Sequence, residues 1–297
     1  MAADGKMTDA RDGRADLHVH SLASDGVSSV AEILDQAERA GLDVIGITDH
    51  ERIDAGIAAR AMAEARGMRV QIVIGEEVTT RGGHVVGLFL RERIRPWGSL
   101  KTTVARIHEQ GGLAIIPHPL VPYPLCASRR SIRKLMNEQD PLFHPDAIEA
   151  FNPTTARMRW ARAVPAFATE VGLPAVAASD AHRAADIGQA LILFPGRTPQ
   201  DVRQAIIAGT ISWEGRPYAW RRQLSLFLEQ QHKNARAVGD EVRGKLLRDG
   251  TGRDLGYPGG RRRPARLDED ALRGEDSPRG ADAPRGDAAL RVEGRAK

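Results

Sequence analysis

Histidine and acidic residues recur where short apolar segments of this sequence begin or end. In Asp16-Leu17-His18-Val19-His20 two histidines stand two positions apart, so on an extended strand both imidazoles would point to one face. Other apolar segments end in Thr48-Asp49-His50, Gly75-Glu76-Glu77, Pro117-His118-Pro119 and Ser179-Asp180-Ala181-His182, and one begins at His84. Of the nine histidines, only His108, His144 and His232 lie away from such segment ends.

This density of imidazoles and carboxylates predicts a metal centre. One such histidine alone is more often a surface residue or a satisfied core residue. Together with Asp25, Asp49, Glu77 and Asp180, however, the histidines would repel one another or stay unpaired without a cation. Nitrogen and oxygen donors without a thiolate suit Mn²⁺, Fe²⁺ or Zn²⁺. The donors are too many for one ion, which predicts two or three divalent ions. Such centres activate water and hold the oxygens of a phosphoryl group.

Alternating strand and helix patterns must position these residues. Apolar runs typical of strands occupy residues 16–20, 43–48, 70–78, 84–90, 113–117, 147–151, 174–179 and 190–194. Patterns typical of helices occupy residues 28–40, 54–66, 99–110, 128–138, 154–171, 199–208 and 217–231. The alternation favours an α/β domain with a largely parallel sheet, open or closed into a barrel. In both cases sites form at the carboxyl ends of the strands.

Composition bounds the class of protein. The chain has 297 residues, of which 41% are hydrophobic, and no apolar run approaches the roughly 20 residues of a membrane helix. The N-terminus lacks the apolar core of a secretion signal, and the single Cys126 excludes an internal disulfide framework. These features predict a cytoplasmic protein without a membrane contact. The net charge of +4 fits an enzyme that acts on phosphates, and equally an arginine-rich protein with no anionic partner.

The two ends of the chain differ from its middle. Residues 1–14 are small and polar, and residues 232–297 are rich in Gly, Arg and Asp but poor in large apolar side chains. Such segments bury too little surface to offset their ordering entropy. We therefore expect a disordered N-terminus, a catalytic domain over residues 15–231, and a disordered charged tail over residues 232–297.

The polar clusters resemble those of the PHP (polymerase and histidinol phosphatase) family of metal-dependent phosphoesterases. The matching motifs span roughly residues 14–215 and are Asp16-Leu17-His18-Val19-His20-Ser21 with Ser24-Asp25-Gly26, Gly46-Ile47-Thr48-Asp49-His50, Gly75-Glu76-Glu77-Val78-Thr79, His84-Val85-Val86-Gly87-Leu88, Ile116-Pro117-His118-Pro119 and Ser179-Asp180-Ala181-His182. The resemblance implies a distorted seven-stranded (β/α) barrel with a trinuclear metal centre. The ligands it implies are His18, His20, Asp25, His50, Glu77, His84, His118, Asp180 and His182. Glu76 competes with Glu77, and we expect it to be exposed on the opposite face.

Other residues are candidates for supporting roles. Asp49 should point away from His50 on an extended strand, where it could hold an imidazole or relay a proton. Asp49 and His182 are the candidate catalytic residues, one of which would protonate the leaving oxygen. Asn152 could contact substrate or water, or serve only as a turn residue before Pro153.

The residues that select the substrate must lie outside the predicted metal ligands. Some relatives carry a long helical insertion between the positions of His84 and His118, and this chain does not. The loop 119–146 then supplies the candidates Arg129 and Arg130, which could bind a phosphate or simply begin a solvated helix. Cys126, in the same loop, has no apparent role.

The function predicted is hydrolysis of phosphate esters by a hydroxide that bridges the metal ions. The resemblance suggests nucleotides, small phosphomonoesters or short oligonucleotides cut from the 5′ end as substrates. Two alternatives stay open, a histidinol-phosphate phosphatase and a non-catalytic, metal-bound regulatory module. No obligate protein partner is evident.

Overall fold

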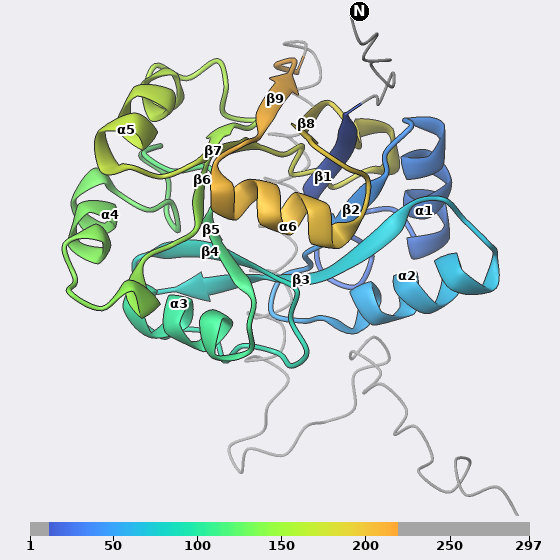
Figure 1. Ribbon diagram of the computed structural model, residues 1–297, viewed down its shortest axis with the longest axis horizontal. Helices are drawn as coiled ribbons and strands as arrows, with labels where there is room; N and C mark the ends of the chain where they lie inside the picture. Colours follow the sequence, from blue (N-terminus) through green and yellow to red (C-terminus); the bar gives the residue numbers. More distant parts are fainter. Residues whose placement is uncertain (1–11, 219–297) are drawn as a thin grey trace, which may run out of the picture. The chain divides into compact units, whose positions relative to one another are not determined.

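The computed structural model of the chain describes residues 12–218, and these residues form one curved sheet flanked by helices (Figure 1). The sheet has nine strands in the order β7-β6-β5-β4-β3-β2-β1-β8-β9. Their bounds are β1 Gly13–Val19, β2 Val44–Ile47, β3 Gln71–Thr80, β4 Gly83–Leu88, β5 Leu113–Ile116, β6 Ala147–Phe151, β7 Ala175–Ala177, β8 Ala190–Phe194 and β9 Ser212–Gly215.

Strands β1 to β7 curve into a nearly closed barrel. Neighbouring strands are parallel except that β4 is antiparallel to both β3 and β5. A bridge between Val19 and Ala181, which follows β7, joins the two ends of the barrel. The backbone N–H of His20 reinforces this closure by donating to the carbonyl of Ala181 at 2.9 Å. The predicted α/β barrel is therefore confirmed, with β8 and β9 added antiparallel beside β1.

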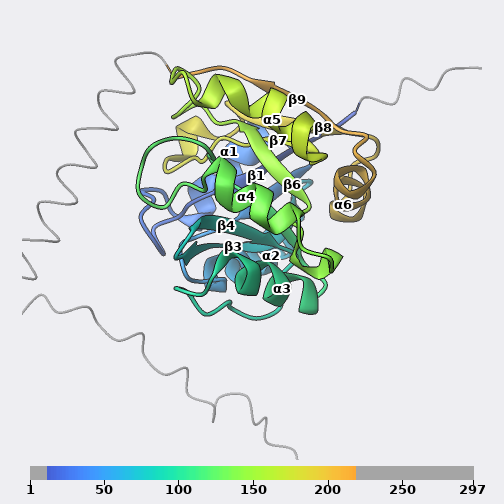
Figure 2. The same cartoon turned by 90° about the vertical axis from the view of Figure 1, so that its left-hand side faces the viewer.

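Helices cover the outside of the barrel and close one of its ends (Figures 1 and 2). Their bounds are α1 Val30–Arg39, α2 Asp54–Ala65, α3 Leu100–Glu109, α4 Arg129–Met136, α5 Val164–Val171 and α6 Pro199–Ala208, with short 3-10 turns at η1 Pro141–Phe143, η2 Ala161–Ala163 and η3 Ala184–Asp186. Helix α6 buries Val202, Ala205 and Ile206 against the residues that fill the barrel. The opposite end of the barrel, where the parallel strands terminate, is not covered by α6.

Alternation along each strand separates the barrel interior from its outer face. Inward residues such as Leu17, Val73 and Ile115 pack together with α6 in one cluster. Outward residues of β1 and β2 pack against α1 and α2, and those of β4 to β6 pack against α3, α4 and α5. Burial on both faces explains why the strands read as continuous apolar runs.

Side-chain caps set the helix boundaries close to those predicted. Ser29, Ser99, Ser128 and Thr198 each accept a hydrogen bond from a backbone N–H in the first turn of α1, α3, α4 and α6. Gly172 ends α5 in the left-handed region at φ 73°, which a residue without Cβ adopts at little cost. The predicted helix start at residue 199 and the predicted helix end at residue 171 are both confirmed.

Two boundaries and one additional strand differ from the prediction. The helix predicted at 154–171 begins only at Val164, because Pro165 lacks an N–H and fits only in a first helical turn. Strand β1 begins at Gly13, inside the segment 1–14 that we expected to be disordered, since it pairs with Leu193 and Phe194 of β8. Strand β9 was not predicted. The tail 232–297 and the helical stretch 217–231, except residues 217 and 218, lie outside the described residues.

Within residues 12–218 no helix combines the length and the apolar composition that a membrane crossing requires.

Candidate metal centre

The open end of the barrel collects the predicted ligands because strand alternation points them inward. Val73 packs inside the barrel, and Glu77 lies four residues later on the same face of β3. Val86 is likewise inside on β4, and His84 precedes it by two residues. Since β4 runs opposite to its neighbours, its beginning lies at the barrel end where the other strands finish. His84 therefore meets Glu77.

An irregularity in β1 brings both of its histidines to the site. Ala15 and Leu17 pack inside the barrel, whereas Val19 packs outside against α1 and α2, although a regular strand would keep all three on one face. The pairing with β2 shifts register between Asp16 and Val19, as at a β-bulge. After the shift the even positions face inward, and the rings of His18 and His20 lie 5.1 Å apart.

Loops beyond the strands supply the remaining residues through unusual backbone conformations. His118 and Asp180 follow β5 and β7 with positive φ values of 30° and 50°, which redirect the chain at the ends of these strands. Asp25 lies in the loop after β1, beside Gly26. A Cβ atom at Gly26 would stand 2.6 Å from the carbonyl oxygen of His20, so this close approach requires glycine.

Glu77 lies at the centre of the cluster and is almost completely buried. Its Oε2 is 3.1 Å from Nε2 of His18, 3.2 Å from that of His20 and 3.5 Å from that of His50. Its Oε1 is 2.7 Å from Nδ1 of His84 and 3.0 Å from Nε2 of His118. Two carboxylate oxygens thus face five imidazole rings.

A second group of carboxylates lies beside Glu77. Asp180 Oδ1 is 3.3 Å from Nε2 of His20 and 3.6 Å from Nδ1 of His182. Asp25 Oδ2 is 2.9 Å from Nε2 of His182, whose ring stacks on that of His20 at 4.3 Å. Three sets of side chains have donor atoms close enough to share an ion: His20, Asp25, His50 and His182; His18, His20, Glu77 and Asp180; and His50, Glu77 and His84.

The electrostatics of the cluster favour ionised carboxylates. Burial alone would raise the pKa of Glu77, but the charges of His18, His84 and His50 outweigh burial and hold this pKa well below its usual range. Burial opposes the charged form of His20, yet the nearby carboxylates of Asp180 and Glu77 raise its pKa to about 10. The buried carboxylates are therefore ionised and stabilise cations among them.

The donor set fits divalent metal ions. Both ring nitrogens of His20 and of His84 are buried and lack a hydrogen-bond partner, although carboxylate oxygens lie nearby. Five imidazole nitrogens face the two oxygens of Glu77, and each carboxylate oxygen accepts only about two hydrogen bonds. Ions held between the nitrogens and oxygens would satisfy these atoms. Imidazole and carboxylate together suit Zn²⁺, Mn²⁺ or Fe²⁺.

All nine predicted ligands lie within this one cluster, whereas the other predicted site residues are not part of it. Asp49 points away from His50, as predicted, and its carboxylate accepts hydrogen bonds from Ser21 and Ser24. It therefore holds the loop that carries Asp25. The guanidinium of Arg129 lies over the ring of Phe167 at 4.6 Å, near Glu170 of α5. Arg130 is exposed beside it.

One expectation about a neighbouring residue was wrong, and one neighbouring contact was not foreseen. Glu76 does face the outer side of the barrel, but it is fully buried, because the segment after β4 covers it and the N–H of Ile94 donates to its Oε2 at 2.8 Å. This burial raises the pKa of Glu76 to about 7. Cys126 touches the cluster, with its Sγ 3.4 Å from Nδ1 of His118.

Sequence reasoning missed Glu149 entirely. Its Oε1 accepts a hydrogen bond from Nδ1 of His18 at 3.0 Å. Its Oε2 accepts from the backbone N–H of His118 at 2.8 Å and from Nδ2 of Asn152 at 3.0 Å. Asn152 also donates to Asp180, so it orients a predicted ligand as well as its own turn. The one signal in the sequence was a charged residue in the buried run Ala147–Phe151.

Comparisons with known proteins agree with this architecture. The PHP domain family model matches residues 16–128, and the PHP-associated model matches residues 159–211. An uncharacterised protein of Methanocaldococcus jannaschii is 35% identical over 150 residues, which cover 47% of this chain and 81% of the relative. The chain therefore belongs to the PHP family of metal-dependent phosphoesterases.

Two further comparisons are more distant. A 5′-3′ exoribonuclease of Haemophilus influenzae is 42% identical over 77 residues, which cover 25% of this chain and 27% of that protein. A solved two-domain protein of Bacteroides vulgatus, described as containing a predicted PHP-like metal-dependent phosphoesterase, superposes with a TM-score of 0.56 at 20% identity. That match covers 70% of this chain and 66% of the other. It supports the fold alone.

Proposed function

We propose that this protein hydrolyses phosphate-ester bonds in nucleotides, in small phosphomonoesters or at the 5′ ends of short oligonucleotides. The observation that carries the proposal is Glu77, one buried carboxylate facing five imidazoles at the open end of a barrel. The local identity to an exoribonuclease supports a substrate with nucleotide character. We place the reaction in the cytoplasm and assign it no protein partner.

In this proposal the nine side chains of the cluster hold two or three Mn, Fe or Zn ions. Bound ions of this kind activate water and stabilise the charge that develops on a phosphoryl group. The residues of the chain then have separate tasks. Glu77 belongs to two of the three candidate donor sets and Asp180 to one, and both would supply oxygen ligands to the ions. Glu149 fixes the ring of His18 through Nδ1, which leaves its Nε2 directed at Glu77.

His182 has a second candidate role, as proton donor to the leaving oxygen in place of metal ligand. Its side chain is 27% exposed, more than those of His18 and His20, so substrate can reach it. Asp25 and the carbonyl of Asp180 hold its two nitrogens at 2.9 and 3.0 Å. Asp49 acts indirectly by fixing the loop of Asp25 through Ser21 and Ser24. Arg129 and Arg130 remain the candidates for contacting substrate outside the cluster.

The test combines metal analysis with a substrate panel. Protein purified without chelators is analysed for Mn, Fe and Zn per chain, then assayed with nucleoside monophosphates and bisphosphates, sugar phosphates and 5′-phosphorylated short RNA. We expect two or three ions and phosphate-ester hydrolysis of one of these classes. A fully metal-loaded protein that hydrolyses none of them would refute the proposal.

A further inference from the structure

A groove lies directly beside the metal cluster, between the loop after β5 and the segment before α5. It has a volume of about 370 Å³ and is lined by Val121, Tyr123, Cys126, Arg129 and Trp160 among others. This volume suits part of a small molecule rather than a protein partner. The groove contains none of the nine predicted ligands.

The groove is joined to the cluster through the loop that forms one of its walls. Cys126 lines the groove, and its Sγ also contacts Nδ1 of His118 at 3.4 Å. The backbone N–H of His84 donates to the carbonyl of Leu125 in the same loop at 2.8 Å. Two predicted ligands therefore fix the position of this wall. A substrate with its phosphate at the cluster would have its adjoining group within reach of the groove.

Two aromatic side chains of the groove are exposed. Tyr123 retains 55% of its surface and Trp160 retains 40%, although aromatic residues are only 4% of the sequence. The guanidinium of Arg159 lies 4.4 Å from the ring of Trp160 and adds positive charge. Exposed aromatic rings beside arginines are the features that stack bases of single-stranded nucleic acids and nucleotides. The opposite end of the substrate, its phosphate, carries negative charge that the cluster would take.

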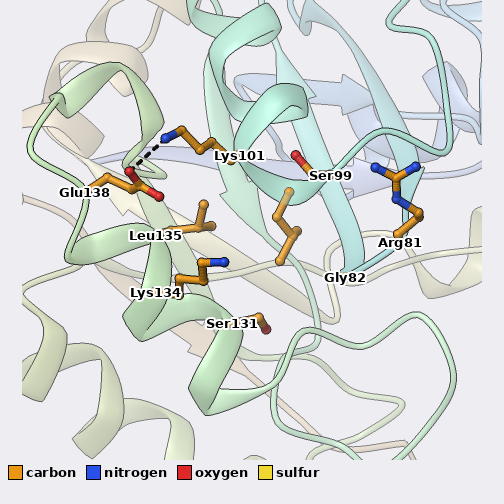
Figure 3. Close-up of a pocket in the computed structure, with 9 residues that line it drawn as sticks. Arg81, Gly82, Ser99, Lys101, Ser131, Lys134, Leu135 and Glu138 are labelled. Atoms are coloured by element: carbon orange, nitrogen blue, oxygen red, sulfur yellow. Dashed lines mark hydrogen bonds and ion pairs between the residues drawn. The ribbon is translucent and has the colours of Figure 1, made fainter.

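The larger cavity elsewhere in the described residues lacks these features. It has a volume of about 440 Å³ and lies between α3 and α4, lined by Ser99, Lys101, Lys134 and Glu138 among others (Figure 3). Lys101 is paired with Glu138 at 2.7 Å, and Ser99 caps α3. No aromatic side chain and no predicted ligand lines it. It therefore provides a control site.

We propose that the groove is the base-binding subsite of this enzyme, with Tyr123 and Trp160 stacking on the nucleobase of a nucleotide substrate. The inference rests on the proposed function and narrows its substrate class to phosphate esters that carry a nucleobase next to the reacting phosphate. It also gives the loop 119–128 and the non-helical segment before α5 a role in place of the absent insertion.

The test compares two substrates that differ only in the base, adenosine 5′-monophosphate and ribose 5-phosphate. Full-length, metal-loaded wild type, Tyr123→Ala, Trp160→Ala and Lys134→Ala are assayed for KM and kcat on both. For the two aromatic variants we expect the KM for the nucleotide to rise by about tenfold, from the usual contribution of base stacking, and the KM for ribose 5-phosphate to stay unchanged. Lys134→Ala should match wild type, and Tyr123→Phe and Trp160→Phe should restore a low KM.

A binding measurement separates this inference from the proposed function. Equilibrium dialysis of adenosine 5′-monophosphate against metal-free protein reports on the groove without any turnover. If wild type hydrolyses neither substrate, the proposed function loses support, and weaker dialysis binding in Tyr123→Ala would still support the groove. Equal losses on both substrates, or unchanged nucleotide binding in both alanine variants, would overturn the inference.

Discussion

Glu77 and Glu76 are adjacent acids with opposite environments. Glu77 faces the imidazoles inside the barrel, whereas Glu76 lies under the segment after β4 and bonds the N–H of Ile94. Both are buried, so exposure does not distinguish them. The alternation of side chains along β3 distinguishes them, because Glu77 lies on the inner face together with Val73 and Glu76 lies on the outer face.

Glu77→Gln should abolish the metal centre while Glu76→Gln preserves it. An amide is neutral and presents one acceptor oxygen, so all five imidazoles lose their anionic partner and those beside the NH₂ group also lose their acceptor. We expect metal affinity and activity to fall by more than about 100-fold in Glu77→Gln. Glu76→Gln keeps an oxygen for the N–H of Ile94 and should bind the wild-type number of ions. Metal analysis after dialysis decides this, and equal metal content in the two variants would contradict it.

Glu149→Gln tests the residue that sequence reasoning missed. Its two oxygens accept hydrogen bonds from His18, His118 and Asn152, and a glutamine would set its NH₂ group against one of these donors. Partners that orient ligands in this way typically contribute 10–100-fold to metal affinity, and we expect a loss in that range. The far-ultraviolet circular dichroism should be unchanged. A variant with wild-type affinity, measured by competition with a chromophoric chelator, would show that His18 needs no such support.

Among the elements, α3 is attached by a charged contact to the segment that leads from η1 into β6. Nδ1 of His108 donates to the carbonyl of Leu142 at 2.8 Å, and Nε2 donates to Asp146 at 2.8 Å. Burial disfavours the charged ring, but the hydrogen bond and charge of Asp146 outweigh burial and raise the pKa of His108 above its ordinary value. The imidazolium form, with both nitrogens donating, is the one that fits.

The His108–Asp146 contact should make stability depend on pH. A histidine whose pKa is raised by folding stabilises the folded state fully at pH values below its unfolded pKa, which is near 6.5. This contribution to stability is lost as the pH rises through the pKa of the folded state. Asp146→Asn should therefore lower the free energy of unfolding by about 1–3 kcal/mol at pH 6, and by less at pH 9. Urea unfolding at the two pH values measures this. A penalty that grows with pH would contradict the assignment.

Strand patterns predicted most elements, because the barrel buries both faces of its strands and helices begin at recognisable caps. The sequence also predicted which residues gather at the open end. It could not show the bulge in β1, which depends on pairing with β2. Nor could it show the covering of Glu76 or the contact of Cys126 with His118, since both depend on loops folding back over the strands.

For the whole molecule, metal binding should stabilise the fold. Ions that bind the folded chain and not the unfolded chain add about 2.7 kcal/mol when their concentration is 100 times Kd. We expect Mn²⁺ or Zn²⁺ to raise Tm in a thermal melt of chelator-treated protein, and the rise to be much smaller in Glu77→Gln. Because the ligating imidazoles must lose protons, the rise should diminish at acidic pH. A Tm that stays unchanged when these ions are added at pH 7 would contradict a metal site in this cluster.

The antiparallel direction of β4 has a consequence for the order in which the chain folds. Glu77 and His84 belong to one hairpin, and His50 is separated from it only by α2 and its loops, so the set formed by these three closes over the shortest sequence separations. The other two sets require Asp180 or His182 to meet residues near the N-terminus, across most of the described chain. Loop closure over longer separations costs more entropy and slows folding. During refolding, we expect the hairpin set to become competent for one ion before the barrel closes and admits the rest.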